Sequence, residues 1–91
     1  MPKPIFFGAT WCPYCQRAMA ALKAHGIAYE LVSMPRDHGE RAGVTWKGKK
    51  FKDLFDGDLS IPKMLVGDDR FMGSDEIIAF AGGQDDDDDD Y

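Results

Sequence analysis

The alternation of apolar and polar positions along the chain predicts four short strands. Residues 4–8 form an apolar run that Gly8 closes, and residues 28–33 alternate between apolar and polar side chains. Residues 62–66 form a second run, and residues 70–72 follow it after a Gly-Asp-Asp turn. The last two strands are therefore expected to form an antiparallel hairpin.

Helical spacing of apolar residues predicts three helices between and after these strands. The first begins at Pro13, which suits the first helical position, and ends at Gly26. A short amphipathic helix is expected over residues 49–55, and a last helix starts with Ser74 as its N-cap and closes at Gly82-Gly83. Residues 34–48 are polar and rich in Gly and Pro, which predicts mostly loop with at most one helical turn.

The predicted order of elements is β-α-β-α-β-β-α, which defines an α/β fold class. A strand-helix-strand start implies parallel pairing through a right-handed crossover, and the later hairpin implies antiparallel pairing. The simplest assembly is a four-stranded mixed sheet with helices on both faces. We expect one domain over residues 1–83 and a disordered acidic tail over residues 84–91.

Charge is concentrated in that tail. The net charge is −5, but Asp85–Asp90 supply six of the 16 acidic residues, so the rest of the chain has ten acids against 11 basic residues. This near-neutral body gives no indication of a nucleic-acid-binding protein, although lysines cluster over residues 47–52. No apolar run is long enough to cross a membrane, and the first residues do not resemble a secretory signal, so we expect a cytoplasmic protein.

The two cysteines give the most specific chemical signal. Cys12 and Cys15 are separated by Pro13-Tyr14 and lie where a helix begins directly after a strand. At the N-cap of that helix, unpaired amide groups and the helix dipole favour a thiolate at Cys12, and the thiolate is the nucleophile toward disulfides. Cys15, one turn later on the same side, could then resolve a mixed disulfide formed on Cys12. This pattern predicts thiol-disulfide exchange.

A zinc site is the structural alternative for the cysteine pair. His25 and His38 could complete a set of two cysteines and two histidines, but their separation of thirteen positions does not fit a zinc finger. A C-x-x-C pair in a strand-helix-strand pattern instead indicates redox chemistry. We therefore expect no metal.

Three motifs resemble those of the glutaredoxins in the thioredoxin superfamily. Cys12-Pro13-Tyr14-Cys15 is identical to the dithiol glutaredoxin active site, Ser60-Ile61-Pro62 is similar to a Thr-Val-Pro motif with a cis proline, and residues 72–76 resemble the Gly-Gly-x-Asp-Asp motif at the last helix. The resemblance covers residues 4–82. It implies a thioredoxin-like fold and a glutathione-dependent enzyme.

The resemblance also implies roles for individual residues. Ile61, before the cis bond to Pro62, would pair with the backbone of the substrate's cysteine. Ser74 and Asp75 would receive the γ-glutamyl end of glutathione, and Tyr14 would form a flat wall of the groove. Read without the resemblance, Pro62 simply starts a strand and Ser74-Asp75 caps a helix.

The chain departs from the glutaredoxin pattern at two positions that usually carry a positive charge. Glutaredoxins usually carry a Lys three residues before the first cysteine and often a basic residue three before the cis proline, where this chain has Ala9 and Leu59. Lys49, or Lys52 nearby, could supply the missing cation that binds a carboxylate of glutathione. Trp11, before the first cysteine, is typical of thioredoxins.

The sequence-based hypothesis is a monomeric oxidoreductase in which Cys12 attacks and Cys15 resolves. Its partners would be glutathione, which is also the reductant, and disulfide-containing proteins, without nucleic acid or membrane. A glutaredoxin-like carrier reduced by thioredoxin reductase, serving for example ribonucleotide reductase, is the first alternative, which Trp11, Ala9 and Leu59 favour. A module that binds a [2Fe–2S] cluster, or a non-catalytic adaptor, is the second.

Overall fold

A computed structural model of the chain describes residues 2–84. Its elements are β1 (Ile5–Gly8), α1 (Pro13–Ala24), β2 (Glu30–Ser33), α2 (His38–Ala42), β3 (Thr45–Trp46), β4 (Lys49–Lys50), α3 (Phe51–Leu54), β5 (Lys63–Val66), β6 (Asp69–Phe71) and α4 (Ser74–Gln84). The four strands and the first and last helices that the sequence predicts are present. The predicted acidic tail lies outside the described residues except for Gln84, with which α4 ends.

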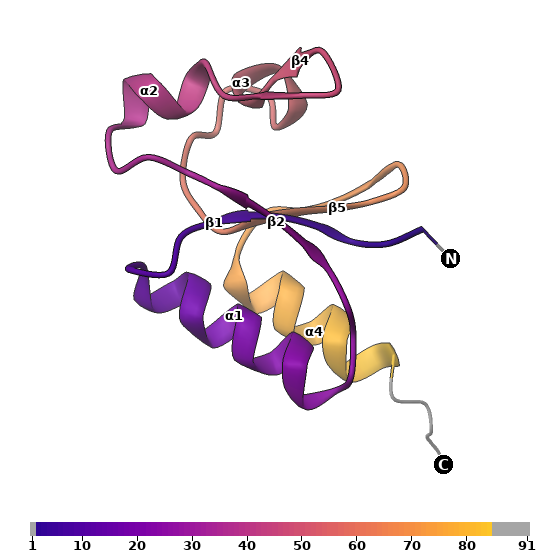
Figure 1. The fold of residues 1–91 in the computed structure, drawn as a ribbon. Coiled ribbons are helices and arrows are strands. Elements are labelled where there is room, and N and C mark those ends of the chain that lie inside the picture. Colours follow the sequence, from indigo (N-terminus) through magenta and orange to yellow (C-terminus); the bar gives the residue numbers. More distant parts are fainter. Residues whose placement is uncertain (1, 85–91) are drawn as a thin grey trace.

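The main sheet has four strands in the order β2-β1-β5-β6. β1 pairs with β2 in parallel, and β5 is antiparallel to both β1 and β6. This is the mixed sheet that the sequence predicts. After β2 the chain passes through the α2–α3 segment before it returns to the sheet as β5, beside β1 (Figure 1). The Ser60-Ile61-Pro62 segment therefore lies immediately before the start of β5.

Two layers of helix cover the sheet. α1 and α4 pack against each other on one face, and α2, α3 and the short β3–β4 hairpin lie on the other (Figure 1). Because neighbouring strand residues point to opposite faces, Phe6 and Phe7 belong to separate cores. Phe6 packs under α1 and α4, whereas Phe7 packs with Phe51 and Phe55. The strand β1 thus anchors both layers.

Residues 34–48 contain more structure than the sequence predicts. Asp37 caps α2, because its Oδ2 accepts a hydrogen bond of 2.9 Å from the Glu40 amide. Lys47 and Gly48 both have positive φ, 49° and 84°, which is the geometry of a tight hairpin turn, and they connect β3 to β4. The helix expected over residues 49–55 is confined to Phe51–Leu54, since Lys49 and Lys50 form β4.

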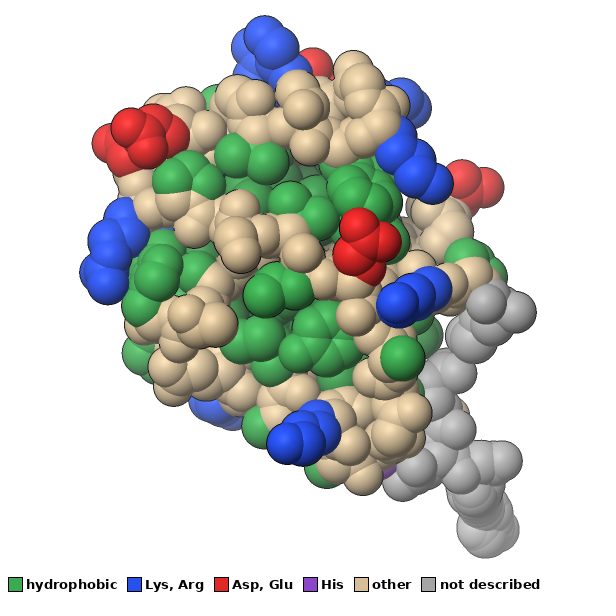
Figure 2. Space-filling view, viewed as in Figure 1, with side chains coloured by type: hydrophobic (Ala, Val, Ile, Leu, Met, Phe, Trp, Pro, Cys, Tyr) green, Lys and Arg blue, Asp and Glu red, His purple; other side chains and the backbone are tan. Residues whose placement is uncertain are grey.

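One edge of the main sheet is formed by β2. Its Leu31 is 39% exposed. In the view of Figure 2, apolar side chains lie in the middle of the molecular surface and most Lys and Arg side chains lie toward its rim.

Candidate active site

Cys12 occupies the N-cap position of α1, as the sequence predicts. Its backbone is extended, with φ −91° and ψ 120°, and Pro13 follows as the first helical residue. The Cys12 Sγ accepts a hydrogen bond of 3.4 Å from the Cys15 amide. The Cys12 sulfur therefore lies at the N-terminus of α1 and is the acceptor for an amide of the first helical turn.

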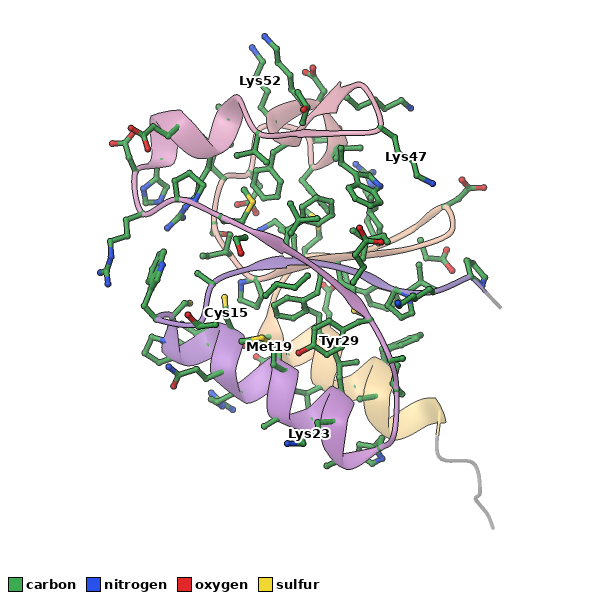
Figure 3. All side chains as sticks on the ribbon, viewed as in Figure 1. Cys15, Met19, Lys23, Tyr29, Lys47 and Lys52 are labelled. Atoms are coloured by element: carbon green, nitrogen blue, oxygen red, sulfur yellow. The ribbon has the colours of Figure 1, made fainter. Side chains whose placement is uncertain are left out.

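The two sulfurs differ in access to solvent. Cys12 is 7% exposed, whereas Cys15 is fully buried and points from α1 toward the sheet (Figure 3). Burial raises the pKa of the Cys15 thiol to about 12, with further contributions from its hydrogen bond and charge interaction with Cys12. Both cysteines are free thiols. This asymmetry suits an attacking Cys12 and a Cys15 that stays protonated until Cys12 has reacted.

A groove of about 360 Å³ lies beside the cysteines, and Tyr14 forms part of its wall. Tyr14 is 60% exposed, and the Ile61-Pro62 peptide bond is cis. The structure therefore brings together five residues that the sequence places in a substrate groove. The groove is lined by Tyr14, Ile61, Pro62, Met72, Gly73, Ser74, Asp75 and Glu76.

The far end of this groove is the N-terminus of α4. Ser74 is the first helical residue and not the predicted N-cap, so α4 begins one residue earlier than expected, and the Ile77 amide donates to the Gly73 carbonyl. Asp75 is exposed, while Glu76 turns back so that its Oε1 accepts a 2.9 Å hydrogen bond from the Met72 amide. The exposed Asp75 carboxylate can bind an ammonium group, and the N-terminus of α4 can bind a carboxylate of the same ligand.

Lys49 is not among the residues that line this groove. It lies in β4 and lines a different cavity with Trp46, Lys47 and Arg70. Lys47 and Lys52 lie in the layer of α3 and the β3–β4 hairpin, on the other side of the sheet from α1 (Figure 3). The structure does not bring the lysine cluster together with the cysteines.

Two arginines lie beside Trp11, and the sequence analysis missed both. The Arg36 guanidinium lies 4.4 Å from the centroid of the Trp11 ring, and that of Arg41 lies 5.9 Å from it. Arg36 is exposed, whereas Arg41 is only 6% exposed. Both belong to the α2 region that was expected to be mostly loop. The Asp37-x-x-Glu40 capping pattern was the signal that could have placed Arg41 on a helix.

A buried lysine follows the cis proline and was also missed. Lys63 is fully buried, and its Nζ donates hydrogen bonds of 2.7 Å to the carbonyl and to the hydroxyl of Ser60. Asp58 Oδ1 lies 3.3 Å from the same nitrogen. Burial lowers the pKa of Lys63, while Asp58 opposes that shift. A lysine inside an otherwise apolar strand run was the available sequence signal.

These features define a class of protein: a thioredoxin-like α/β fold in which a C-x-x-C pair opens the first helix and faces a cis-proline loop. The glutaredoxin family model matches residues 5–70, which is more than two thirds of the chain. The chain belongs to the glutaredoxin family and is a glutaredoxin-type oxidoreductase.

Individual relatives agree with this assignment. The chain is 29% identical over 75 residues to a probable glutaredoxin of Synechocystis sp., covering 80% of this chain and 77% of the relative. It is 25% identical over 79 residues to a glutaredoxin of Pseudomonas aeruginosa, covering 87% and 84%. The two relatives are therefore matched over most of their length.

Solved structures share the fold. The crystal structure of an Archaeoglobus fulgidus glutaredoxin superposes with a TM-score of 0.59 at 23% identity, covering 80% of this chain and 76% of that one. A glutathione transferase homologue of Drosophila mojavensis, solved with bound glutathione, gives a TM-score of 0.76 at 19% identity. The match covers 92% of this chain but only 36% of the transferase, so the likeness concerns the fold of about one third of that protein.

Within residues 2–84, no helix is long and apolar enough to cross a membrane. Within the same range, no three His, Cys, Asp or Glu side chains lie together as a metal-binding group.

Proposed function

We propose that this glutaredoxin uses both cysteines to reduce protein disulfides and glutathione mixed disulfides, with glutathione as the reductant. The observation that carries the proposal is the asymmetry of the pair, an N-capping Cys12 that keeps 7% of its surface exposed and a Cys15 that is fully buried. A nucleophile must reach its substrate, whereas a resolving thiol needs only to reach its neighbour.

In the first step the Cys12 thiolate attacks a sulfur of the substrate disulfide, a new S–S bond forms on Cys12, and the other sulfur leaves as a thiolate. Where the sulfur now bound to Cys12 is that of glutathione, a second glutathione can attack it, which restores the Cys12 thiolate and releases oxidised glutathione. Alternatively Cys15 attacks Cys12 Sγ, transfers its proton to the leaving thiolate, and forms the Cys12–Cys15 disulfide. Two glutathione molecules reduce this disulfide and are themselves oxidised, so electrons and protons balance in both routes.

The groove supports glutathione as the bound thiol. In this proposal Ile61 pairs with its cysteine backbone beside Pro62 and Tyr14, and Ser74 with Asp75 receives its γ-glutamyl end. The third charged group of glutathione, its glycyl carboxylate, needs a cation. Arg36 lies on Trp11, next in sequence to Cys12, whereas Lys49 lines another cavity. The geometry favours Arg36 over the sequence-based choice of Lys49.

A carrier reduced by thioredoxin reductase is the second candidate. Trp11 beside Cys12 is 37% exposed, which is the observation that favours it. One assay separates the two: turnover of a small glutathione mixed disulfide in the presence of glutathione, glutathione reductase and NADPH, repeated with thioredoxin reductase in place of glutathione and its reductase. We expect turnover in the first mixture. Turnover only in the second would overturn glutathione as the reductant.

A further inference from the structure

Two consecutive carbonyl groups before the cis proline are held by buried cations from different elements. The Leu59 carbonyl accepts a 3.0 Å hydrogen bond from Nη1 of Arg41, in α2. The next carbonyl, that of Ser60, accepts a 2.7 Å hydrogen bond from Nζ of Lys63, in β5. We propose that Arg41 and Lys63 are positioning residues that together fix the backbone of Ile61 for substrate pairing. This inference rests on the proposed role of Ile61.

Arg41 ties two segments of the site to each other. Besides Leu59, its guanidinium donates to the carbonyls of Pro35 at 2.8 Å and Arg36 at 3.2 Å. One planar fork therefore connects the loop that carries Arg36 with the loop that carries Ile61. A lysine could not reproduce this arrangement, because it lacks the rigid fork that holds several acceptors in one plane.

Lys63 holds the same loop from the sheet. Its ammonium contacts the Ser60 carbonyl, the Ser60 hydroxyl and the Asp58 carboxylate. Asp58 in turn accepts from the Ser60 amide at 3.0 Å and from its hydroxyl at 2.7 Å. The residues immediately before Ile61 are thus fixed through their backbone as well as their side chains.

Stability alone does not explain these two cations. Burying a charged group is costly, and a hydrophobic residue of similar volume is often equally stabilising in such a place. Phe7, the strand partner of Lys63, packs with Phe51 and Phe55 on this face of the sheet, so an apolar side chain would suit the position of Lys63. What an apolar residue cannot do is hold the Ser60 carbonyl, and with it the edge that Ile61 offers to the substrate.

Two variants test whether Arg41 and Lys63 position the Ile61 backbone. Arg41→Lys keeps the positive charge but loses the fork, and Lys63→Met removes the cation with little change in volume. We expect KM for a glutathione mixed disulfide to rise about fivefold or more in each, with kcat within about twofold, because one or two loop hydrogen bonds are lost. Alkylation of Cys12 by iodoacetamide, which needs no backbone pairing, should keep its rate. The matched control is Lys23→Met, which removes an exposed cation from the last turn of α1.

Each outcome decides the proposal. A wild-type KM in either folded variant would overturn it, since the proposal requires both residues. Should Lys63→Met fail to fold, Ser60→Ala at the exposed loop removes one partner of Lys63 and should raise KM about twofold. Failure of the proposed function would look different, because the wild-type protein itself would then show no glutathione-dependent turnover.

Discussion

Gly8 lies directly against the sulfur of Cys15. A Cβ atom built on Gly8 would come within 2.9 Å of Cys15 Sγ and would also collide with the Phe6 ring. The end of β1 therefore has no room for a side chain where it passes Cys15. The absence of a Cβ at this position is what lets α1 bring Cys15 so close to the sheet.

This contact predicts that Gly8→Ala destabilises the protein. Overpacking a filled core costs about 1–3 kcal/mol, so the free energy of unfolding in urea should fall by about that amount. Gly82→Ala, in α4, is the matched control because nothing lies within 4 Å of a Cβ there. Equal stability of the two variants would contradict the close packing at Gly8.

The burial of Cys15 predicts selective alkylation. Since the pKa of its thiol is raised to about 12 and it is fully buried, Cys15 should stay unmodified by iodoacetamide at pH 8, while Cys12 reacts. Mass spectrometry should find one adduct on the native protein and two in urea. The native Cys12→Ser variant should gain none. Two adducts forming at equal rates on the native protein would contradict the assigned asymmetry.

Separate roles for the cysteines predict separate losses of activity. Cys12→Ser should abolish all turnover, because no nucleophile remains. Cys15→Ser should keep reduction of a glutathione mixed disulfide, which glutathione can complete, but lose reduction of a protein disulfide. Both substrates should be assayed on each variant. Turnover by Cys12→Ser would refute the mechanism.

The fold could be predicted largely because its signals are local. The apolar run that Gly8 closes, Pro13 at a helix start and the hairpin after residue 66 each indicate one element, and their order allows few sheets. The α2 region was missed because its signals are weaker. Gly and Pro favoured a loop, although Asp37 and Glu40 form a capping pattern.

The site was predictable where a motif carries it. Cys12, Cys15 and the groove residues lie at the positions that their motifs imply, because each motif fixes its own backbone. The positions of the Lys and Arg side chains could not be predicted in the same way. Lys49 was chosen as a replacement for the cations missing at Ala9 and Leu59, but it lies in β4, whereas Arg36 and Arg41 reach Trp11 through tertiary packing.

Asp58 predicts a pH dependence of stability. Hydrogen bonds from Ser60, with Lys63 nearby, hold the pKa of the Asp58 carboxyl below its usual value of 3.8. Between the folded and unfolded pKa values the unfolded chain binds more protons, so this contribution is present above the unfolded pKa and is lost as pH falls through the folded pKa. The difference in melting temperature between Asp58→Asn and the wild type should therefore shrink as the pH falls below 3.8. A gap that is constant from pH 7 to pH 2.5 would contradict this.

Comparing Arg36→Ser with Lys49→Ser identifies the cation that serves glutathione. Arg36 is exposed and lies on Trp11, the residue before Cys12, so its loss should raise KM for glutathione about threefold or more, as expected for one solvent-exposed charged contact. The effect should shrink in high salt because the contact is electrostatic. Lys49→Ser should change KM less, since Lys49 lines a different cavity from the groove. KM should be measured for both variants at low and high salt, with the glutathione reductase assay. A larger effect from Lys49→Ser would restore the sequence-based assignment and remove Arg36 from the site.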